Sequence, residues 1–356
     1  MFHLWRLKMI LKWLALAGTV VFHATNIFAA GLHTTRPEWL AESQSIVEAS
    51  QQDGPHILLR LDVTDVIEGR LKATRDEVRS LLREARIGYT GLASSARTVQ
   101  VHITDPAQLD LAKAAIKTVT DPVADSGVQE MTLDDSEPGL LKFTVTDAGL
   151  KYRTSAALAQ SVEVIKDRIR DLGATHPVVR STNEDGILVR TSGVADPQRL
   201  GQILTRPGHL SFQLVDLSMP VDEAISGRPP VGSAVFYSMD DPPVPYLIEN
   251  RVILSGKNVL DAQATRNLAT DERVVSFRLD SRGTARFKWA TTQYIGKPFA
   301  VILDDKVISA PVIREPIEGG TGQISGNFTA ESANDLALLL RTGPLPARLT
   351  IAEEAR

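Results

Sequence analysis

The sequence predicts an α+β fold in which two ferredoxin-like β-α-β-β-α-β units form a base and a separate α+β unit forms a head. Three observations predict it. Strand-like and helix-like segments alternate between residues 55 and 216, and the order of these elements occurs twice. A proline-rich linker follows at residues 217–245. A different mixed segment then occupies residues 246–350.

The first predicted unit of the base begins with an apolar strand. Alternation predicts strands at residues 56–62, 98–103 and 140–146, and helical spacing predicts helices at residues 65–85 and 106–119.

The second predicted unit repeats this order. We expect helices at residues 156–172 and 197–204, and strands at residues 177–181, 187–191 and 210–216.

Two helices of the base begin at equivalent places with Asp-Pro, at Asp105 and Asp196. An aspartate accepts hydrogen bonds from the first free N–H groups of a helix, and proline fits the first helical position. The matched starts indicate an internal repeat, in which the two units share the strand at residues 140–146.

The linker and the head differ from the base in composition. Six prolines between residues 217 and 245 disfavour long regular elements there. In the head, Asp304 and Asp305 indicate a tight hairpin, and Ser281 and Thr329 are expected to cap two helices. The strands expected there are residues 274–279, 299–303, 307–310 and 323–326, and the helices are residues 282–295 and 330–341.

Composition excludes several classes of function. The 356 residues are 43% hydrophobic, which permits sizeable cores, and the formal net charge of -4 comes without a basic block that would suit nucleic acid. The chain has no cysteine, so disulfides, thiol catalysis and cysteine-ligated metals are excluded.

The N-terminus has the pattern of a secretory signal. Basic residues precede a short apolar run at residues 13–21, and small residues end it at Ala29 and Ala30. We expect residues 1–30 to be a cleaved signal peptide of a periplasmic protein. The alternative is an uncleaved N-terminal anchor in the inner membrane, with a periplasmic domain.

Searches for a reactive centre find none. The histidines lack metal-ligand spacing, and no Gly-x-Ser-x-Gly elbow is present. Asp304 and Asp305 are adjacent on a predicted turn, where their side chains point apart. The loop at residues 319–322 is not followed by the lysine of a phosphate-binding loop. We therefore expect no catalytic, cofactor or metal site.

Three long motifs in the head resemble a known family. They read KVISAPVI (306–313), IEGGTGQISGNF (317–328) and ANDLALLLRTGPLPA (333–347). These closely resemble the periplasmic head of SecD, a subunit of the bacterial Sec protein-export translocase. The second unit of the base, with its GVADP helix start at residues 193–197, is also similar to SecD. The resemblance extends over roughly residues 55–350.

Two departures from SecD shape the expectation. The Gly-Leu-Asp-Leu-x-Gly-Gly motif of the family is largely missing at residues 50–56. SecD also continues into transmembrane helices that serve proton-driven work, whereas this sequence stops at Arg356. The chain is then either a stand-alone relative of the periplasmic domain or part of a longer gene product that was cut. The missing motif and the signal-like N-terminus favour the first, so we expect a stand-alone relative without proton coupling of its own.

The resemblance implies a non-enzymatic binding module whose partners are unfolded exported polypeptides and, as a second class, membrane subunits of the Sec translocase. Leu336 and Leu340, at helical spacing, also fit a buried core face. The candidate contact residues are Ile313, Arg314, Glu315, Pro316, Ile317, Phe328, Leu336 and Leu340.

Two other functions remain open at this point. One is a regulatory or assembly subunit that docks on the Sec membrane complex without gripping a passenger. The other is a periplasmic hydrolase that uses scattered Asp, His and Ser residues.

Overall fold

The computed structural model describes residues 56–182, 185–192, 196–268 and 270–355. They all fall within the second of the chain's two units, Gly54–Arg356. The expected signal peptide or anchor and the altered motif at residues 50–55 lie outside the described residues. In the part of the chain that is described, no helix has the length and apolar character needed to cross a membrane.

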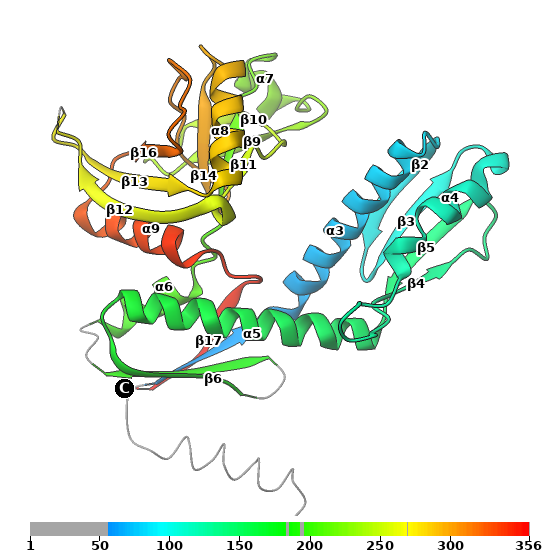
Figure 1. Cartoon of the computed structure of the whole chain (residues 1–356), viewed down its shortest axis with the longest axis horizontal. Coiled ribbons are helices and arrows are strands. Elements are labelled where there is room, and N and C mark those ends of the chain that lie inside the picture. The colour runs from blue at the N-terminus through cyan, green and yellow to red at the C-terminus, as the bar shows by residue number, and fades with distance from the viewer. Residues whose placement is uncertain (1–55, 183–184, 193–195, 269, 356) are drawn as a thin grey trace, which may run out of the picture. The chain divides into compact units, whose positions relative to one another are not determined.

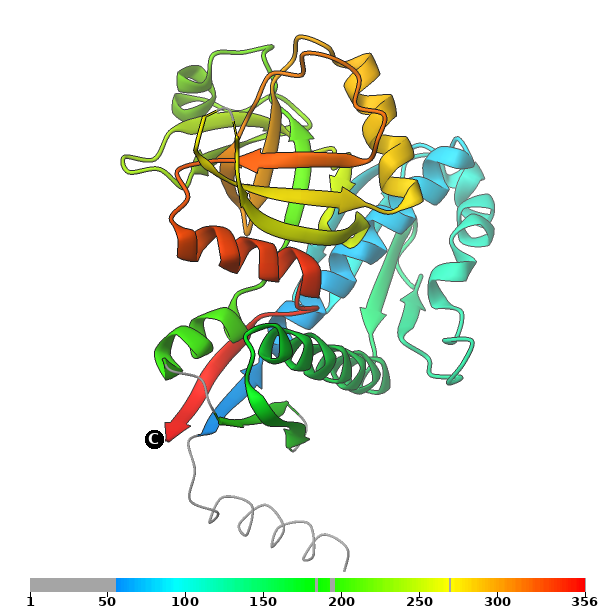
Figure 2. The same cartoon turned by 60° about the vertical axis from the view of Figure 1, so that its left-hand side comes forward.

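The first and last described strands lie side by side in a four-stranded antiparallel sheet, the base sheet, with strand order β17-β1-β7-β6 (Figure 1). Its strands are β1 (His56–Leu61), β6 (Thr175–Thr182), β7 (Gly186–Ser192) and β17 (Leu349–Ala355). The helices α5 (Asp147–Asp171) and α6 (Pro197–Thr205) lie on the same face of this sheet, as Figures 1 and 2 both show.

Alternation along β1 explains how the base sheet holds its helices. Ile57, Leu59 and Leu61 are buried, because they face α5 and α6. Ile165 and Ile169 of α5, one helical turn apart, belong to the same apolar cluster. The base therefore has a single core between one sheet and two helices. In chain order its elements are β1, α5, β6, β7, α6 and β17, a β-α-β-β-α-β series.

A second four-stranded sheet belongs to the segment between β1 and α5, which we call the inserted unit (residues 63–145). Its strand order is β2-β3-β5-β4. Its strands are β2 (Tyr89–Ser95), β3 (Thr98–Ile103), β4 (Met131–Asp134) and β5 (Leu140–Val145). Its helices are α3 (Val63–Glu84), α4 (Leu109–Ala115) and the 3₁₀ turns η1 (Pro106–Gln108) and η2 (Lys117–Thr120).

This arrangement differs from the two predicted repeats. The strand at residues 56–61 pairs with β7 and β17, not with the strands that follow it in the first predicted unit. The strand at residues 140–145 lies between β3 and β4 and is not shared with the base sheet. The inserted unit therefore has the order α-β-β-α-β-β. Apolar alternation predicts that a segment is a half-buried strand, but it does not identify the partner.

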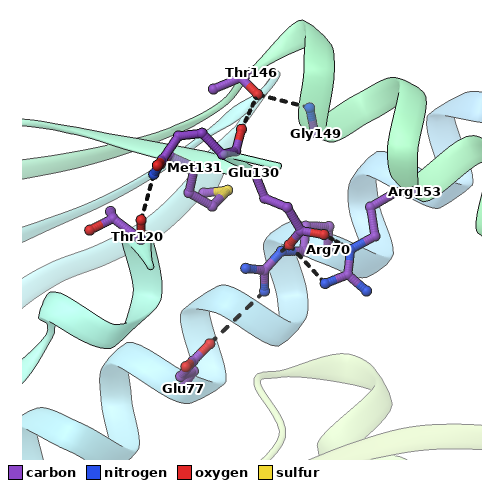
Figure 3. Close-up of polar contacts among 9 residues, drawn as sticks. Arg70, Glu77, Thr120, Glu130, Met131, Thr146, Gly149 and Arg153 are labelled. Carbon is purple, nitrogen blue, oxygen red and sulfur yellow. Dashed lines mark hydrogen bonds and ion pairs between the residues drawn. The ribbon is translucent and has the colours of Figure 1, made fainter. Parts of the chain in front are cut away.

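A buried carboxylate connects the inserted unit to α5. Glu130, just before β4, is 4% exposed, and Figure 3 shows two arginines converging on it. Arg70 of α3 approaches Oε2 at 3.1 Å, and Arg153 of α5 approaches Oε1 at 2.5 Å and donates to Oε2 at 2.8 Å. At Gly149 of α5 a Cβ would lie 2.6 Å from the backbone of Glu130, so only glycine permits this approach.

The remaining described elements, residues 210–342, form the head. Its strands are β8 (Leu210–Leu214), β9 (Ser233–Ser238), β10 (Pro245–Glu249), β11 (Leu254–Ser255), β12 (Val259–Arg266), β13 (Arg273–Leu279), β14 (Phe299–Leu303), β15 (Lys306–Ser309) and β16 (Thr321–Ser325). Its helices are α7 (Val221–Ser226), the 3₁₀ turn η3 (Gly256–Asn258), α8 (Ser281–Gln293) and α9 (Ala330–Thr342).

Two sheets enclose the core of the head. The six-stranded sheet has the order β10-β9-β15-β14-β8-β11, and the three-stranded sheet has the order β12-β13-β16. The rings of Phe212, Phe277, Phe287 and Phe299 meet between them, with centroids 5.6 to 6.4 Å apart. Gly322 lies against Phe277, where a Cβ would come within 2.5 Å of the ring. The glycine motif of the head is thus explained by packing.

The boundary between base and head differs from the predicted one. The strand at residues 210–214 pairs with β14 and β11, so it belongs to the head. The proline-rich segment at residues 217–245 contains α7 and β9, and β9 pairs with β10 and β15. Prolines flank these elements and do not interrupt them, which is why their number alone did not indicate regular structure.

The predicted helix caps and the predicted hairpin largely agree with the structure. Asp105, Asp196 and Thr329 cap their helices through side-chain oxygens, as expected. The helix α8 begins one residue earlier than expected, because Asp280 and not Ser281 accepts the N–H of Gly283, at 2.5 Å. At the predicted hairpin, Asp304 and Asp305 have φ of 50° and 63°, which suits a tight two-residue turn.

Replacing Glu130 by glutamine is expected to lower the free energy of unfolding by about 3 kcal/mol, because Arg70 and Arg153 would lose their shared counter-charge. Urea denaturation of the full chain measures this. The control is Glu163→Gln, which removes an exposed pair with Lys166 on α5 and should cost less than about 0.5 kcal/mol. Equal losses in both variants would contradict a stabilising role for the buried carboxylate.

Candidate functional site

Arg168 of α5 is fully buried where the base meets the head, and its guanidinium group donates only to backbone carbonyls. Nη1 donates to the oxygens of Ile203 and Arg206 at 2.8 and 2.6 Å. Nη2 donates to the oxygens of Pro207 and Gly343 at 3.3 and 3.2 Å. One side chain therefore contacts the ends of both α6 and α9.

These two helix ends are the places where the chain passes between base and head. It leaves the base after α6 and returns to it after α9. The last carbonyls of a helix lack partners within the helix and carry partial negative charge, which suits a guanidinium with five N–H donors. Arg168 thus provides hydrogen-bond donors for the carbonyls of both crossings. The two crossings also contact each other directly, because the N–H of Leu345 donates to the oxygen of Pro207 at 2.8 Å.

Burial lowers the pKa of Arg168 to about 10, and the charge of Asp304 opposes this shift. The guanidinium therefore stays charged at neutral pH. Gly208 (φ +78°) makes room for it, since a Cβ there would lie 3.1 Å from Nη2. The junction therefore requires the long, charged side chain of Arg168 and a glycine at position 208.

Ion pairs surround the Arg168 junction. Arg199 of α6 lies 2.7 Å from Asp335 and 3.1 Å from Glu331, both on α9. Arg341 of α9 pairs with Asp171 of α5. These contacts tie α9, which lies below the three-stranded sheet in Figures 1 and 2, to both helices of the base.

The sequence-predicted contact segment follows β15 on the surface of the head. Arg314, Glu315 and Pro316 are exposed, whereas Ile313 is buried and Ile317 is half-buried. The backbone holds the segment in place: Ile313 and the loop after α8 exchange hydrogen bonds, and the N–H of Ile317 donates to the hydroxyl of Thr291 at 2.9 Å. The exposed part of this candidate site is therefore short and fixed at both ends.

Three of the predicted apolar contact residues, Phe328, Leu336 and Leu340, do not lie together on the surface. Leu336 and Leu340 are 3% and 2% exposed and belong to the core of the head, where β12 and β13 contact α9. Phe328 is half-buried against the same core. The helical spacing of Leu336 and Leu340 correctly indicated a buried face, and strands β12 and β13 of the head cover it.

The search of the sequence missed an aromatic cluster next to the contact segment. The guanidinium of Arg251 lies 5.4 Å from the ring centre of Trp289. The rings of Trp289 and Tyr294 meet edge to face at 5.8 Å, and the amine of Lys297 lies 5.5 Å from Tyr294. Trp289 follows buried Phe287 by two positions, about 200° around the helix, so helical spacing alone could have placed it on the exposed side.

A shallow pocket of about 430 Å³ lies on the three-stranded sheet. Its lining includes side chains that can donate and accept hydrogen bonds, namely those of Gln263, Ser276, Thr321 and Gln323. Within the described ranges, no group of three His, Asp or Glu side chains is placed to hold a metal ion.

Comparison with known proteins identifies the class of domain. Residues 233–347 match the SecDF P1 head subdomain, and residues 158–217 match the N-terminal part of the P1 domain of protein translocase subunit SecDF. The chain is thus built as a P1-type domain. It carries the P1 domain of the SecD/SecDF family.

Curated relatives are longer than this chain. It is 33% identical to the protein translocase subunit SecD of Acetobacter pasteurianus over 303 residues, which are 85% of this chain and 57% of that protein. It is 30% identical to SecD of Magnetococcus marinus over 356 residues, 98% of this chain and 66% of that protein. The chain thus spans little more than half the length of the first of these relatives.

A crystal structure of SecDF in a super-membrane-facing form is also similar. The match has 28% sequence identity and a TM-score of 0.47, and it covers 56% of this chain and 28% of that one.

Replacing Arg168 by methionine is expected to lower the free energy of unfolding by about 3–5 kcal/mol, because the buried carbonyls of both crossings would lose their donor. Urea denaturation measures the loss, and limited proteolysis should find new cleavage at residues 342–348. The matched control is Arg170→Met, an exposed arginine on the same helix, with an expected change below about 0.5 kcal/mol. A loss no larger than that of the control would contradict the role given to Arg168.

Proposed function

We propose that this chain is a SecD-like periplasmic binding module that assists protein export or handles translocated unfolded polypeptides, without proton coupling of its own. The match of residues 233–347 to the SecDF P1 head carries the proposal. The relatives' description as protein translocase subunits supports the link to Sec-dependent export.

The surface of the head gives this proposal a physical basis. An unfolded polypeptide presents apolar side chains that a folded protein buries. Beside the exposed segment at residues 314–316, the head presents Val312 and Ile295, which are 53% and 52% exposed. Within the proposal, this surface meets the passenger, while the base supports the head through the Arg168 junction.

We also infer that the base sheet with α5 and α6 is a ferredoxin-like unit. Its four strands, numbered in chain order, lie in the order 4-1-3-2, and the connections follow a β-α-β-β-α-β series. The periplasm is the proposed compartment, in keeping with the signal-like pattern of residues 1–30.

Binding of unfolded passengers tests the proposal. The full chain, immobilised, is exposed to one exported protein in two forms, native and permanently unfolded by reduction and carboxymethylation. We expect the unfolded form to bind at least about tenfold more tightly, because only that form presents its apolar side chains. Equal affinity for both forms, or no binding of either, would count against the proposal.

Crosslinking in cells distinguishes the alternative of a regulatory or assembly subunit. Contacts with many different passengers support the binding module. Contacts confined to the membrane subunits of the translocase would instead assign a docking function.

A further inference from the structure

We propose that the exposed surface around α8, formed by Arg251, Arg282, Arg286, Trp289 and Lys297, binds apolar polypeptide segments that carry carboxylates. This inference rests on the proposed function and specifies the chemistry of the passenger segment. We call this set of residues the α8 surface.

The exposed side of α8 is cationic. Arg282, Arg286 and Trp289 follow one another at helical spacing, and all three are exposed. The helix also carries Lys288, which pairs with Glu318 at 2.8 Å, and it contains no acidic residue. Across the described part of the chain, neither Arg282 nor Arg286 has an ion-pair partner, so both cations are available to an anionic ligand.

Aromatic rings extend this cationic stripe. Trp289 is 44% exposed, and its ring lies between the guanidinium of Arg251 and the ring of Tyr294. The amine of Lys297 lies over the ring of Tyr294. These cation–ring contacts hold Arg251 and Lys297 next to the two rings. A carboxylate next to an apolar side chain could therefore form an ion pair while its neighbour packs on Trp289.

The apolar part of the surface comes from three separate segments. Val252 follows Arg251, Ile295 follows Tyr294, and Val312 precedes the predicted contact segment; each is at least half exposed. The N–H of Gly296 donates to the oxygen of Ile313 at 2.8 Å, which places the last two segments side by side. Trp, Tyr and Arg are the residues most enriched among those that dominate binding energy.

Nearby carboxylates do not cancel the positive charge. Glu318 is already paired with Lys288, and its pKa is lowered mainly by the hydrogen bond from that amine. Glu315 is exposed in the contact segment and Glu249 lies at the end of β10. The α8 surface itself carries three arginines and one lysine and no carboxylate, which favours an acidic partner.

A lipid surface fits this geometry less well than a polypeptide does. A helix that lies on a membrane turns a wide apolar face outward. In α8 the apolar residues Phe287 and Ala290 are buried in the head, and Trp289 is the only large apolar side chain that the helix exposes. We therefore assign the α8 surface to a peptide segment.

Fluorescein-labelled peptides test the assignment by anisotropy with the full chain. Three 15-residue peptides share the same Leu and Phe positions and carry glutamate, glutamine or lysine between them. We expect the glutamate peptide to bind at least about tenfold more tightly than the lysine peptide, and its affinity to fall as salt is raised. Similar affinities for the glutamate and lysine peptides would overturn the inference.

Variants locate the binding. Trp289→Ala should lower the affinity for the glutamate peptide at least about tenfold. The double variant R282Q/R286Q should bind the glutamate peptide only as tightly as the unchanged chain binds the glutamine peptide. All three replaced side chains are exposed, and R282Q/R286Q removes both charges while it keeps polar side chains at these positions. Arg170→Gln, an exposed arginine on α5, is the control and should leave binding unchanged.

The outcomes separate this inference from the proposed function. Failure to bind any unfolded passenger or peptide would overturn both. Binding of unfolded passengers that is unaffected by Trp289→Ala and by R282Q/R286Q would overturn the α8 assignment alone. So would binding of phosphatidylglycerol vesicles by the full chain that depends on Trp289 while peptide binding does not.

Discussion

The guanidinium group of Arg168 holds the chain together at the place where it passes twice between base and head. A buried cation is costly unless hydrogen bonds compensate it, and here the carbonyls of Ile203, Arg206 and Gly343 do so. The same contacts satisfy helix ends that would otherwise be buried without partners. The head is an insertion between α6 and β17, and Arg168 contacts both of its connections to the base.

The two insertions into the base are fixed in a similar manner. The inserted unit is bound to α5 by Glu130, and the head is bound to α5 by Arg168, so a single helix carries a buried charged contact to each. Around these two points, apolar clusters supply most of the stabilisation, one each in the base and the inserted unit and two in the head.

Local signals predicted much of this fold, and non-local pairing explains what they missed. Asp196 and Thr329 cap their helices as expected, since a cap depends on residues within one turn. The pairing of β1 with β17 could not be predicted, because alternation in residues 56–61 is compatible with any partner strand. Glu130 lies between the elements predicted at residues 106–119 and 140–146, so no periodicity indicated its burial. The spacing of Leu336 and Leu340 indicated an apolar face but not the strands that cover it. Spacing from Phe287 places Trp289 on the exposed side of its helix, but it does not show that Arg251, from a distant segment, lies against the ring.

Hydrogen exchange of the full chain, followed by mass spectrometry with and without an unfolded, carboxymethylated exported protein, tests the central claim most directly. In the proposed function the head, and not the base, meets the passenger. We therefore predict added protection at residues 294–298 and 311–317, beside Trp289, with the strands of the base sheet unchanged. Protection confined to the base sheet or the inserted unit, or no added protection anywhere, would contradict it.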